Sequence, residues 1–194
     1  MSEYWKNPPE ENNPINYLTP NCWVRSGDFV NKIEFLGLKD NSILELGSGL
    51  GRNLAVLKYA GYSDVSGVEI NRNAVALMHD NFPILQDTMI RIDSIQKVLF
   101  SLEKNCFDLV FTMATLEHID YSFDFCLKEI SRIAKKYIIT VEDEKRNGPR
   151  HFSRNYKKIF EGLGFQQIKL FSLLGLGDCF KMRIFQRKGV RNRE

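Results

Sequence analysis

The sequence predicts an α/β fold in which a mostly parallel sheet carries helices on both faces. From residue 42 onward, short runs rich in β-branched residues alternate with amphipathic stretches, which is the pattern of βαβ units. The 194 residues suffice for one domain, and the apolar fraction of 43% is typical of globular proteins. A glycine-rich turn directly follows the first run, at the sheet edge where such folds bind ligands.

Five short runs are the expected parallel strands, at residues 42–46, 65–70, 89–93, 107–112 and 137–141. The stretches between them have apolar residues three and four positions apart, which is helical spacing. These helices follow the glycine turn, Asn71 and Tyr121. Each helix is therefore expected to cover one face of the sheet.

The pattern changes after residue 141. Residues 142–150 read as a charged loop, and a helix is expected from Ser153 toward Gly164. Residues 167–171 and 180–186 read as two further strands, separated by a glycine-containing stretch. We expect these two strands to form an antiparallel hairpin added to the parallel sheet.

Residues 1–41 form an expected N-terminal arm and helix that cover the site, residues 42–188 the main domain, and residues 189–194 a basic tail. The proline-rich start is expected to be extended, and residues 22–36 to form one helix. The arm carries Tyr4, Trp5 and Tyr17. Exposed aromatic residues on such an arm can cover a bound ligand or a neighbouring subunit, and both alternatives stay open.

Composition excludes several classes of protein. A net charge of +3 is too small to indicate a nucleic-acid partner. The four cysteines include no Cys-x-x-Cys pair, which argues against a zinc site or a disulfide framework. No apolar run is long enough to span a bilayer and the start is polar, so we expect no membrane partner and a cytoplasmic location.

Residues 43–53 read Ile-Leu-Glu-Leu-Gly-Ser-Gly-Leu-Gly-Arg-Asn, a strand that ends in a glycine loop and opens into a helix. Glycines let the backbone approach a ligand closely because they carry no Cβ. A dinucleotide fingerprint requires a third glycine at the position that Arg52 occupies. The loop therefore favours a nucleoside ligand that has no pyrophosphate.

Two carboxylates follow the next two strands. Glu69 ends the second strand, where a carboxylate can accept hydrogen bonds from ribose hydroxyls. Asp93 ends the third strand and can accept from an adenine amino group. The ends of parallel strands meet at one edge of the sheet, so these groups predict a nucleoside site there.

Four segments carry a family resemblance: residues 43–53, 65–70, 93–95 and 107–119. Together they resemble the successive motifs of class I S-adenosylmethionine-dependent methyltransferases. Leu-Glu-His-Ile at residues 116–119, followed by residues 129–133, is similar to the small-molecule branch that includes the ubiquinone-biosynthesis type. The resemblance implies a Rossmann-like fold whose seven-stranded sheet is mostly parallel with an antiparallel last strand.

The resemblance also implies the cofactor S-adenosylmethionine and its contacts. The glycine loop would wrap the methionine and ribose, and the ends of the second and third strands would hold the ribose and the adenine. The implied cofactor-binding residues are Glu45, Gly47, Ser48, Gly49, Gly51, Glu69, Ile70, Asp93, Ser94, Ile95, Thr112 and Met113. Many relatives have a Pro-Gly-Gly turn before the fifth strand, which is absent here and leaves the start of that strand open.

His118 and His151 are the candidate catalytic residues. His118 follows the fourth strand, where the resemblance implies the acceptor cavity, and a histidine of near-neutral pKa can act as a general base. A packing role for His118 stays open as an alternative. His151 lies in a segment that crosses the acceptor side in similar proteins, whereas His79 falls inside a helix and is discounted.

The acceptor is less specified. Arg150, Arg154 and Tyr156 form a cluster that would suit a phosphate or carboxylate, although a solvated helix start is the simpler explanation. Magnesium ligands of the catechol type are not evident, so no metal is expected, and residues 142–144 are interpreted as a charged loop. No sequence of the type that holds a flipped base follows the fourth strand.

The sequence therefore predicts an enzyme that methylates an oxygen or nitrogen of a small polar metabolite, with a phosphorylated or sugar-like intermediate favoured. An RNA or protein methyltransferase is the alternative enzyme. A methyltransferase-like partner without catalysis is the alternative of another class. The oligomeric state is not predicted.

Overall fold

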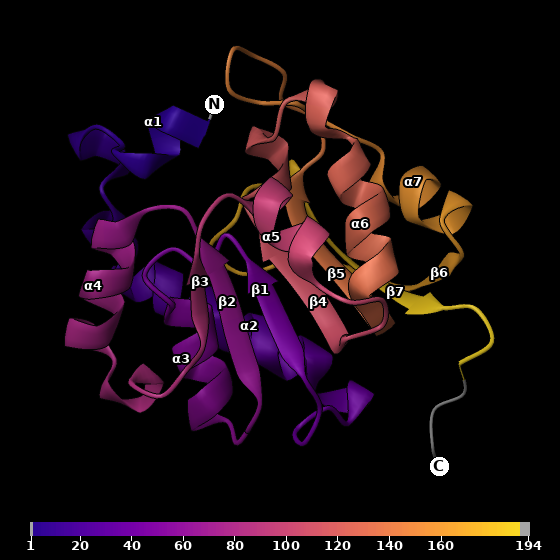
Figure 1. The fold of residues 1–194 in the computed structure, drawn as a ribbon, viewed down its shortest axis with the longest axis horizontal. Helices are drawn as coiled ribbons and strands as arrows, with labels where there is room; N and C mark the ends of the chain where they lie inside the picture. The colour runs from indigo at the N-terminus through magenta and orange to yellow at the C-terminus, as the bar shows by residue number, and fades with distance from the viewer. Residues whose placement is uncertain (1, 191–194) are drawn as a thin grey trace.

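The computed structural model describes residues 2–190 and contains one seven-stranded sheet with helices on both faces (Figure 1). The strand order is β3-β2-β1-β4-β5-β7-β6. Strand β7 runs in the opposite direction to the other six strands. The predicted fold class is confirmed. The strands are β1 (Ile43–Leu46), β2 (Val65–Glu69), β3 (Ile90–Ile92), β4 (Phe107–Met113), β5 (Ala134–Asp143), β6 (Phe165–Phe171) and β7 (Phe180–Arg187).

The helices form one layer on each face of the sheet. In Figure 1, α5, α6 and α7 lie in front of the sheet, and α2 and α3 lie behind it. Helices α2, α3 and α4 share one apolar core with the sheet, and α5, α6 and α7 share the other. The α-helices are α1 (Ser2–Lys6), α2 (Pro20–Ile33), α3 (Arg52–Tyr59), α4 (Arg72–Asn81), α5 (Ile95–Ser101), α6 (Phe125–Ile133) and α7 (Tyr156–Gly162).

The two cores explain the strand sequences. In β4, Leu109 and Phe111 belong to the core under α2, α3 and α4, whereas Val110 belongs to the opposite one. Successive side chains of a strand point to opposite faces, so a strand covered on both sides has apolar residues on both faces. This is why the centre of β4 reads as a continuous apolar run rather than as an alternating pattern.

The hairpin formed by β6 and β7 joins the sheet through its second strand. β7 lies between β5 and β6, so β6 becomes the edge of the sheet. Gly164, with φ of 91°, follows α7 and begins the turn into β6. The antiparallel hairpin was predicted, but its place in the strand order was not.

Strand β5 is longer than the predicted residues 137–141. It starts at Ala134 directly after α6 and continues through Asp143. Glu142 pairs with Lys181 and Asp143 with Phe180 on β7, and both acidic residues are almost fully buried. The interpretation of residues 142–144 as a charged loop is therefore wrong for the first two, because β7 extends the ladder past Val141.

The N-terminal arm is folded rather than extended, which corrects the sequence expectation. After α1, 3-10 turns occupy Glu10–Asn12 and Pro14–Tyr17. Helix α2 was predicted and begins at Pro20, a residue suited to a first helical turn. Further 3-10 turns are Glu34–Leu36, Pro83–Leu85, Leu116–His118 and Tyr121–Phe123.

Arg52 fixes this arm to the main domain. Its guanidinium donates to the Tyr17 carbonyl at 2.8 Å and to Ser26 Oγ on α2 at 2.7 Å.

Within residues 2–190, no helix is both long and apolar enough to cross a membrane. Of the expected basic tail, residues 191–194 lie outside the described part of the chain.

Gly51 provides a test of the packing behind the glycine loop. Its φ is 77°, and an added Cβ would lie 2.6 Å from Met78 Cγ on α4. We therefore expect Gly51→Ala to lower the free energy of unfolding by about 1–3 kcal/mol, measured by urea denaturation. Gly162→Ala is the matched control, since nothing lies within 4 Å of that position. Equal unfolding midpoints for the two variants would contradict this account.

Candidate active site

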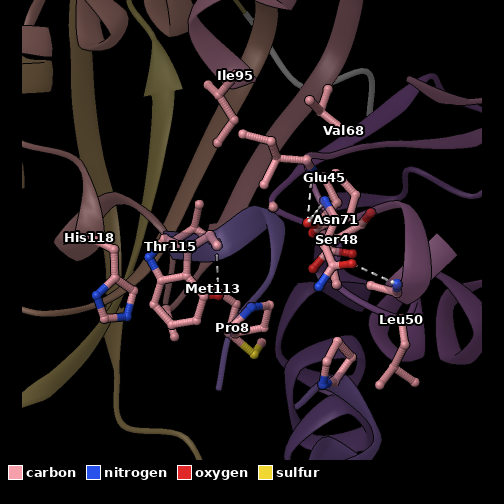
Figure 2. A pocket seen from close by; sticks show the side chains of 18 of the residues that line it. Pro8, Glu45, Ser48, Leu50, Val68, Asn71, Ile95, Met113, Thr115 and His118 are labelled. Atoms are coloured by element: carbon pink, nitrogen blue, oxygen red, sulfur yellow. Dashed lines mark hydrogen bonds between the residues drawn. The ribbon is translucent and has the colours of Figure 1, made fainter. Parts of the chain in front are cut away.

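A cavity of about 360 Å³ lies where the parallel strands end. Its walls are the segments that follow β1, β2, β3 and β4 together with residues of the N-terminal arm, and it stays partly open to solvent. Figure 2 shows Met113 and Thr115 between His118 on one side of the view and Glu45, Ser48 and Asn71 on the other. The cavity therefore joins the glycine loop to the segment after β4.

Most of the predicted cofactor-binding residues line this cavity: Glu45, Gly47, Ser48, Gly49, Glu69, Ile70, Asp93, Ser94, Ile95 and Met113. Gly51 and Thr112 do not. Gly51 faces Met78 and Leu85, so its lack of a side chain serves helix packing. Thr112 lies one residue before Met113 on β4, and the alternation of a strand turns its side chain to the opposite face.

Two glycines of the loop have different tasks. A Cβ on Gly47 would lie 2.4 Å from Thr115 Oγ1, so this glycine lets the loop approach the segment after β4. Gly49 has φ of 56°, and nothing lies within 4 Å of the place where its Cβ would stand. The space in front of Gly49 is open to a ligand.

Glu69 closes the loop from the next strand. Its Oε2 accepts from the Gly49 N–H at 2.7 Å, and its Oε1 accepts from the Ile70 and Asn71 N–H groups at 2.8 Å each. Burial raises the pKa of this carboxyl despite these hydrogen bonds. Asp93 is different, since its pKa is lowered by the hydrogen bond from the Ser94 N–H.

Glu45 is the least solvated carboxyl of the cavity wall. It is 1% exposed, and burial raises its pKa to about 8. Asn53 Nδ2 donates to its Oε1 at 2.7 Å, while its Oε2 has no hydrogen-bond partner among the described residues. A buried carboxyl oxygen without a donor is costly, so this position suits a cationic or donor group of a ligand.

The hydrogen bonds behind Glu45 continue into the arm. Ser26 Oγ donates to Asn53 Oδ1 at 2.6 Å, and Arg52 Nε donates to the same hydroxyl at 2.7 Å. Arg25, also on α2, lines the cavity and donates to the Gly175 carbonyl at 2.7 Å. Its buried Nε has no partner in the described residues, and so offers a donor near the cavity.

His118 lies at the end of the cavity opposite Glu45 and Ser48. Its Nδ1 lies 2.7 Å from the Arg150 carbonyl, which can only accept, so Nδ1 carries the proton and Nε2 is a bare acceptor. Burial lowers its pKa, which keeps the ring neutral. The Trp5 ring packs against it at a centroid distance of 4.8 Å. The structure thus places this predicted residue in the cavity wall.

His151 does not line the cavity, but its ring lies 4.8 Å from the His118 ring between centroids. It sits in a short bridge where the Gly148 N–H donates to the His151 carbonyl at 3.0 Å. Burial lowers the pKa of His151 as well. The two candidate catalytic histidines are therefore neighbours, from segments far apart in the chain.

The proposed anion cluster is not assembled. Arg154 is 7% exposed, and its guanidinium donates to Asp124 at 2.7 Å and to the Ile119 carbonyl at 2.7 Å. Tyr156 is fully buried in the core under α6 and α7. Arg150 stacks on the Tyr4 ring at 4.5 Å. These residues hold the loop after β5 to the rest of the domain.

Glu142 is the residue that sequence reasoning missed. Its Oε2 accepts from the Thr115 N–H at 3.0 Å and the Glu117 N–H at 3.2 Å, which fixes the turn that carries His118. Burial raises its pKa to about 8. Ala114, which precedes this turn, has φ of 52°, a left-handed conformation that is unusual for alanine. The position of Glu142 at a strand end was the only available signal.

The pKa of Glu45 predicts how stability depends on pH. Between its ordinary value of 4.5 and about 8, the folded protein holds a proton that the unfolded chain has lost, so stability falls as pH rises. Glu45→Gln keeps the acceptor for Asn53 and cannot ionise. The free energy of unfolding of the wild type should fall between pH 5 and 8. For Glu45→Gln this decrease should be smaller by roughly 2–4 kcal/mol, measured by urea titration. Parallel curves for the two proteins would contradict the shift.

Residues 44–138 match the family described as Methyltransferase domain. No curated protein matches the chain in sequence. Solved structures match its fold. The magnesium protoporphyrin IX methyltransferase of Synechocystis PCC 6803, solved with bound SAH, is 15% identical, with a TM-score of 0.75 over 96% of this chain and 98% of that chain.

Two further methyltransferase structures show the same fold. A putative sarcosine dimethylglycine methyltransferase from Galdieria sulphuraria is 13% identical, with a TM-score of 0.68 over 84% of this chain and 85% of that one. A SAM-dependent methyltransferase from Archaeoglobus fulgidus is 17% identical, with a TM-score of 0.64 over 84% and 92%. The family match lies on the strands that build the cavity, so the chain carries a methyltransferase domain, and its fold is that of the class I S-adenosylmethionine-dependent methyltransferases.

Proposed function

We propose that this methyltransferase methylates an oxygen or nitrogen of a small polar metabolite. The observation that carries the proposal is the continuous cavity from the glycine loop to His118, which residues of the N-terminal arm also line. When bound, S-adenosylmethionine supplies an activated methyl group, so the protein mainly has to align the acceptor and exclude water.

The cavity wall fits the cofactor. The unpartnered Oε2 of Glu45 suits the ammonium group of the methionine portion, and the open space at Gly49 admits the ribose. Glu69 has oxygen lone pairs left for the ribose hydroxyls, and Asp93 stands where it can accept from the adenine amino group. Arg25 offers a guanidinium donor that suits a carboxylate.

The cavity wall is partly aromatic. Trp5, Tyr17 and Phe123 are among its lining residues, and the Trp5 ring packs against His118. A concave, partly aromatic space of this volume suits a compact metabolite better than a polymer chain. The bare Nε2 of His118 is available to the acceptor, either as a general base or as a ligand of a bound ion.

The main observation that favoured a phosphorylated or sugar-like acceptor does not hold in the folded chain. That preference depended on Arg150, Arg154 and Tyr156 acting together, and the guanidinium of Arg154 is already occupied by Asp124 and three carbonyls. The proposal therefore keeps a small polar acceptor without a preferred anionic group.

Two alternatives are testable. If RNA were the acceptor, binding would weaken steeply with salt, so filter binding of mixed RNA fragments at two salt concentrations distinguishes it. If the protein were a partner without catalysis, it would bind cofactor but produce no methylated product with any acceptor. Neither alternative has an observation that favours it over a metabolite enzyme.

Cofactor binding is tested by Gly49→Arg, which fills the open space at the loop. We expect calorimetric titration with S-adenosylmethionine to show at least about a hundredfold loss of affinity, because the added side chain occupies the ligand volume and the backbone is left-handed. Gly162→Arg on α7 adds the same side chain where nothing lies within 4 Å and should bind normally. Equal affinity in Gly49→Arg and the wild type would refute the cofactor site.

The acceptor is tested with methyl-labelled cofactor and a panel of phenols, aliphatic alcohols and primary amines. We expect transfer to members of one chemical class, and His118→Asn should lower turnover at saturating cofactor by about 10²–10⁴-fold. His79→Asn, which changes a histidine of α4 away from the cavity, is the matched control. Full turnover in His118→Asn would remove that residue from the mechanism.

A further inference from the structure

Three side chains that commonly bind metals meet beside the acceptor end of the cavity. The ligand atoms of Glu117, His118 and His151 all lie within 4.8 Å of one another. Glu117 and His118 come from the turn after β4, and His151 from the loop after β5. Two imidazoles and one carboxylate are the donor set of many sites that keep coordination positions open for a substrate.

The orientation of His118 is that of a metal ligand. Its Nδ1–H donates to the Arg150 carbonyl, so the lone pair of Nε2 points elsewhere in the ring plane. Nε2 lies 3.6 Å from Oε1 of Glu117. This distance is too long for a hydrogen bond between the two atoms, and both carry lone pairs, so the gap between them suits a cation. A backbone carbonyl that holds the second ring nitrogen is also the usual outer contact of a ligating histidine.

The other two ligands are held in place by the backbone. The Asp143 N–H donates to Oε2 of Glu117, which leaves Oε1 free to face His118. The Phe152 N–H donates to the Glu117 carbonyl at 2.7 Å, which joins the turn after β4 to the segment that carries His151. Arg146, a cation on this loop, is paired with Asp143 at 3.7 Å.

The spacing is close to that of a loaded site. Ligand atoms around a zinc-sized ion are about 3–3.5 Å apart, because each bond is about 2.0–2.2 Å long. The pair from Glu117 and His118 already has this separation, at 3.6 Å. His151 is partly exposed and belongs to a loop, so it can close the remaining distance of about 1 Å without disturbing the sheet.

We propose that Glu117, His118 and His151 bind a divalent transition-metal ion that coordinates an oxygen of the methyl acceptor. The set differs from the catechol-type magnesium ligands that the sequence lacks, and imidazole nitrogens favour zinc, iron or cobalt over magnesium. His118 also lines the cavity, so an ion on its Nε2 lies at the acceptor end. The part that concerns the acceptor rests on the proposed function, whereas the metal site itself does not.

The chemistry that follows is O-methylation. A hydroxyl coordinated to the ion is more acidic than a free one, so its proton passes to water and its oxygen becomes the nucleophile. That oxygen forms a bond to the methyl carbon while the carbon–sulfur bond of the sulfonium breaks, which leaves a neutral thioether. One proton is released for each methyl group transferred, and no oxidant or reductant is needed.

Metal binding is tested on the full chain after removal of metals with EDTA. Calorimetric titration with Zn²⁺ should show one equivalent, and His151→Asn and Glu117→Gln should each weaken it at least about tenfold. His79→Asn, which removes the histidine outside the cluster, should bind as the wild type does. Equal zinc affinity in all four proteins, or no zinc binding by the wild type, would overturn the proposal.

Cobalt distinguishes the ligands. Addition of Co²⁺ should give visible d–d bands that disappear in His118→Asn and show no thiolate-to-metal charge-transfer band. A thiolate band would assign the ion to a cysteine, such as Cys179, which interacts with Asp143, and would overturn the site.

The two proposals fail separately. The stripped protein should still bind S-adenosylmethionine with unchanged affinity, and should lose at least about tenfold in turnover with a hydroxyl acceptor until Zn²⁺ is restored. Unchanged turnover after stripping would overturn the role of the ion in catalysis. Zinc binding without cofactor binding would refute the proposed function and leave the metal site standing.

Discussion

The buried guanidinium of Arg52 holds together the parts from which the cavity is built. It belongs to the first turn of α3, yet it donates to Ser26 on α2 and to the Tyr17 carbonyl of the arm. Through Ser26 and Asn53 the same hydrogen bonds reach Glu45 at the end of β1. Strand, glycine loop, helix and arm are thereby fixed to one another. A guanidinium suits this task because its donors form a rigid planar fork.

Three buried carboxyls give the edge of the sheet its chemical character. Glu45, Glu117 and Glu142 have pKa values raised to about 8, 7 and 8, mainly because burial penalises their charged forms. Each lies at or after a strand end, where backbone N–H groups or a ligand can compensate for lost hydration. Desolvation of carboxyl groups is therefore concentrated at the edge of the sheet that borders the cavity.

Much of the fold and of the cofactor side could be predicted from the sequence, because both depend on local patterns. Parallel strands are covered on both faces and read as apolar runs, and the glycine loop with Glu69 occupies consecutive strand ends. Gly51 shows the limit of such reasoning: it belongs to the motif, but only the packing of Met78 against it shows that it serves a helix. Its role depends on a contact between segments that the motif does not contain.

The acceptor side of the cavity is harder to predict from the sequence because it is built from contacts between residues far apart in the chain. Glu142 was interpreted as a loop residue, since nothing near it in sequence shows that β7 would extend the ladder past Val141. Arg154 resembled an anion receptor until Asp124 and the carbonyls around it were in place. The neighbourhood of His118 and His151 likewise depends on two loops that meet only in the folded chain.

The reversed direction of β7 has a practical consequence for the laboratory. Because β7 runs against the parallel strands, its last residue, Arg187, lies at the sheet edge away from the cavity, and Figure 1 shows α1 and the end of β7 on opposite sides of the molecule. Helix α1, in contrast, contains Trp5, which lines the cavity. An affinity tag or fluorophore fused after the last strand leaves the cavity entrance unobstructed. One fused before α1 lies next to the cavity entrance.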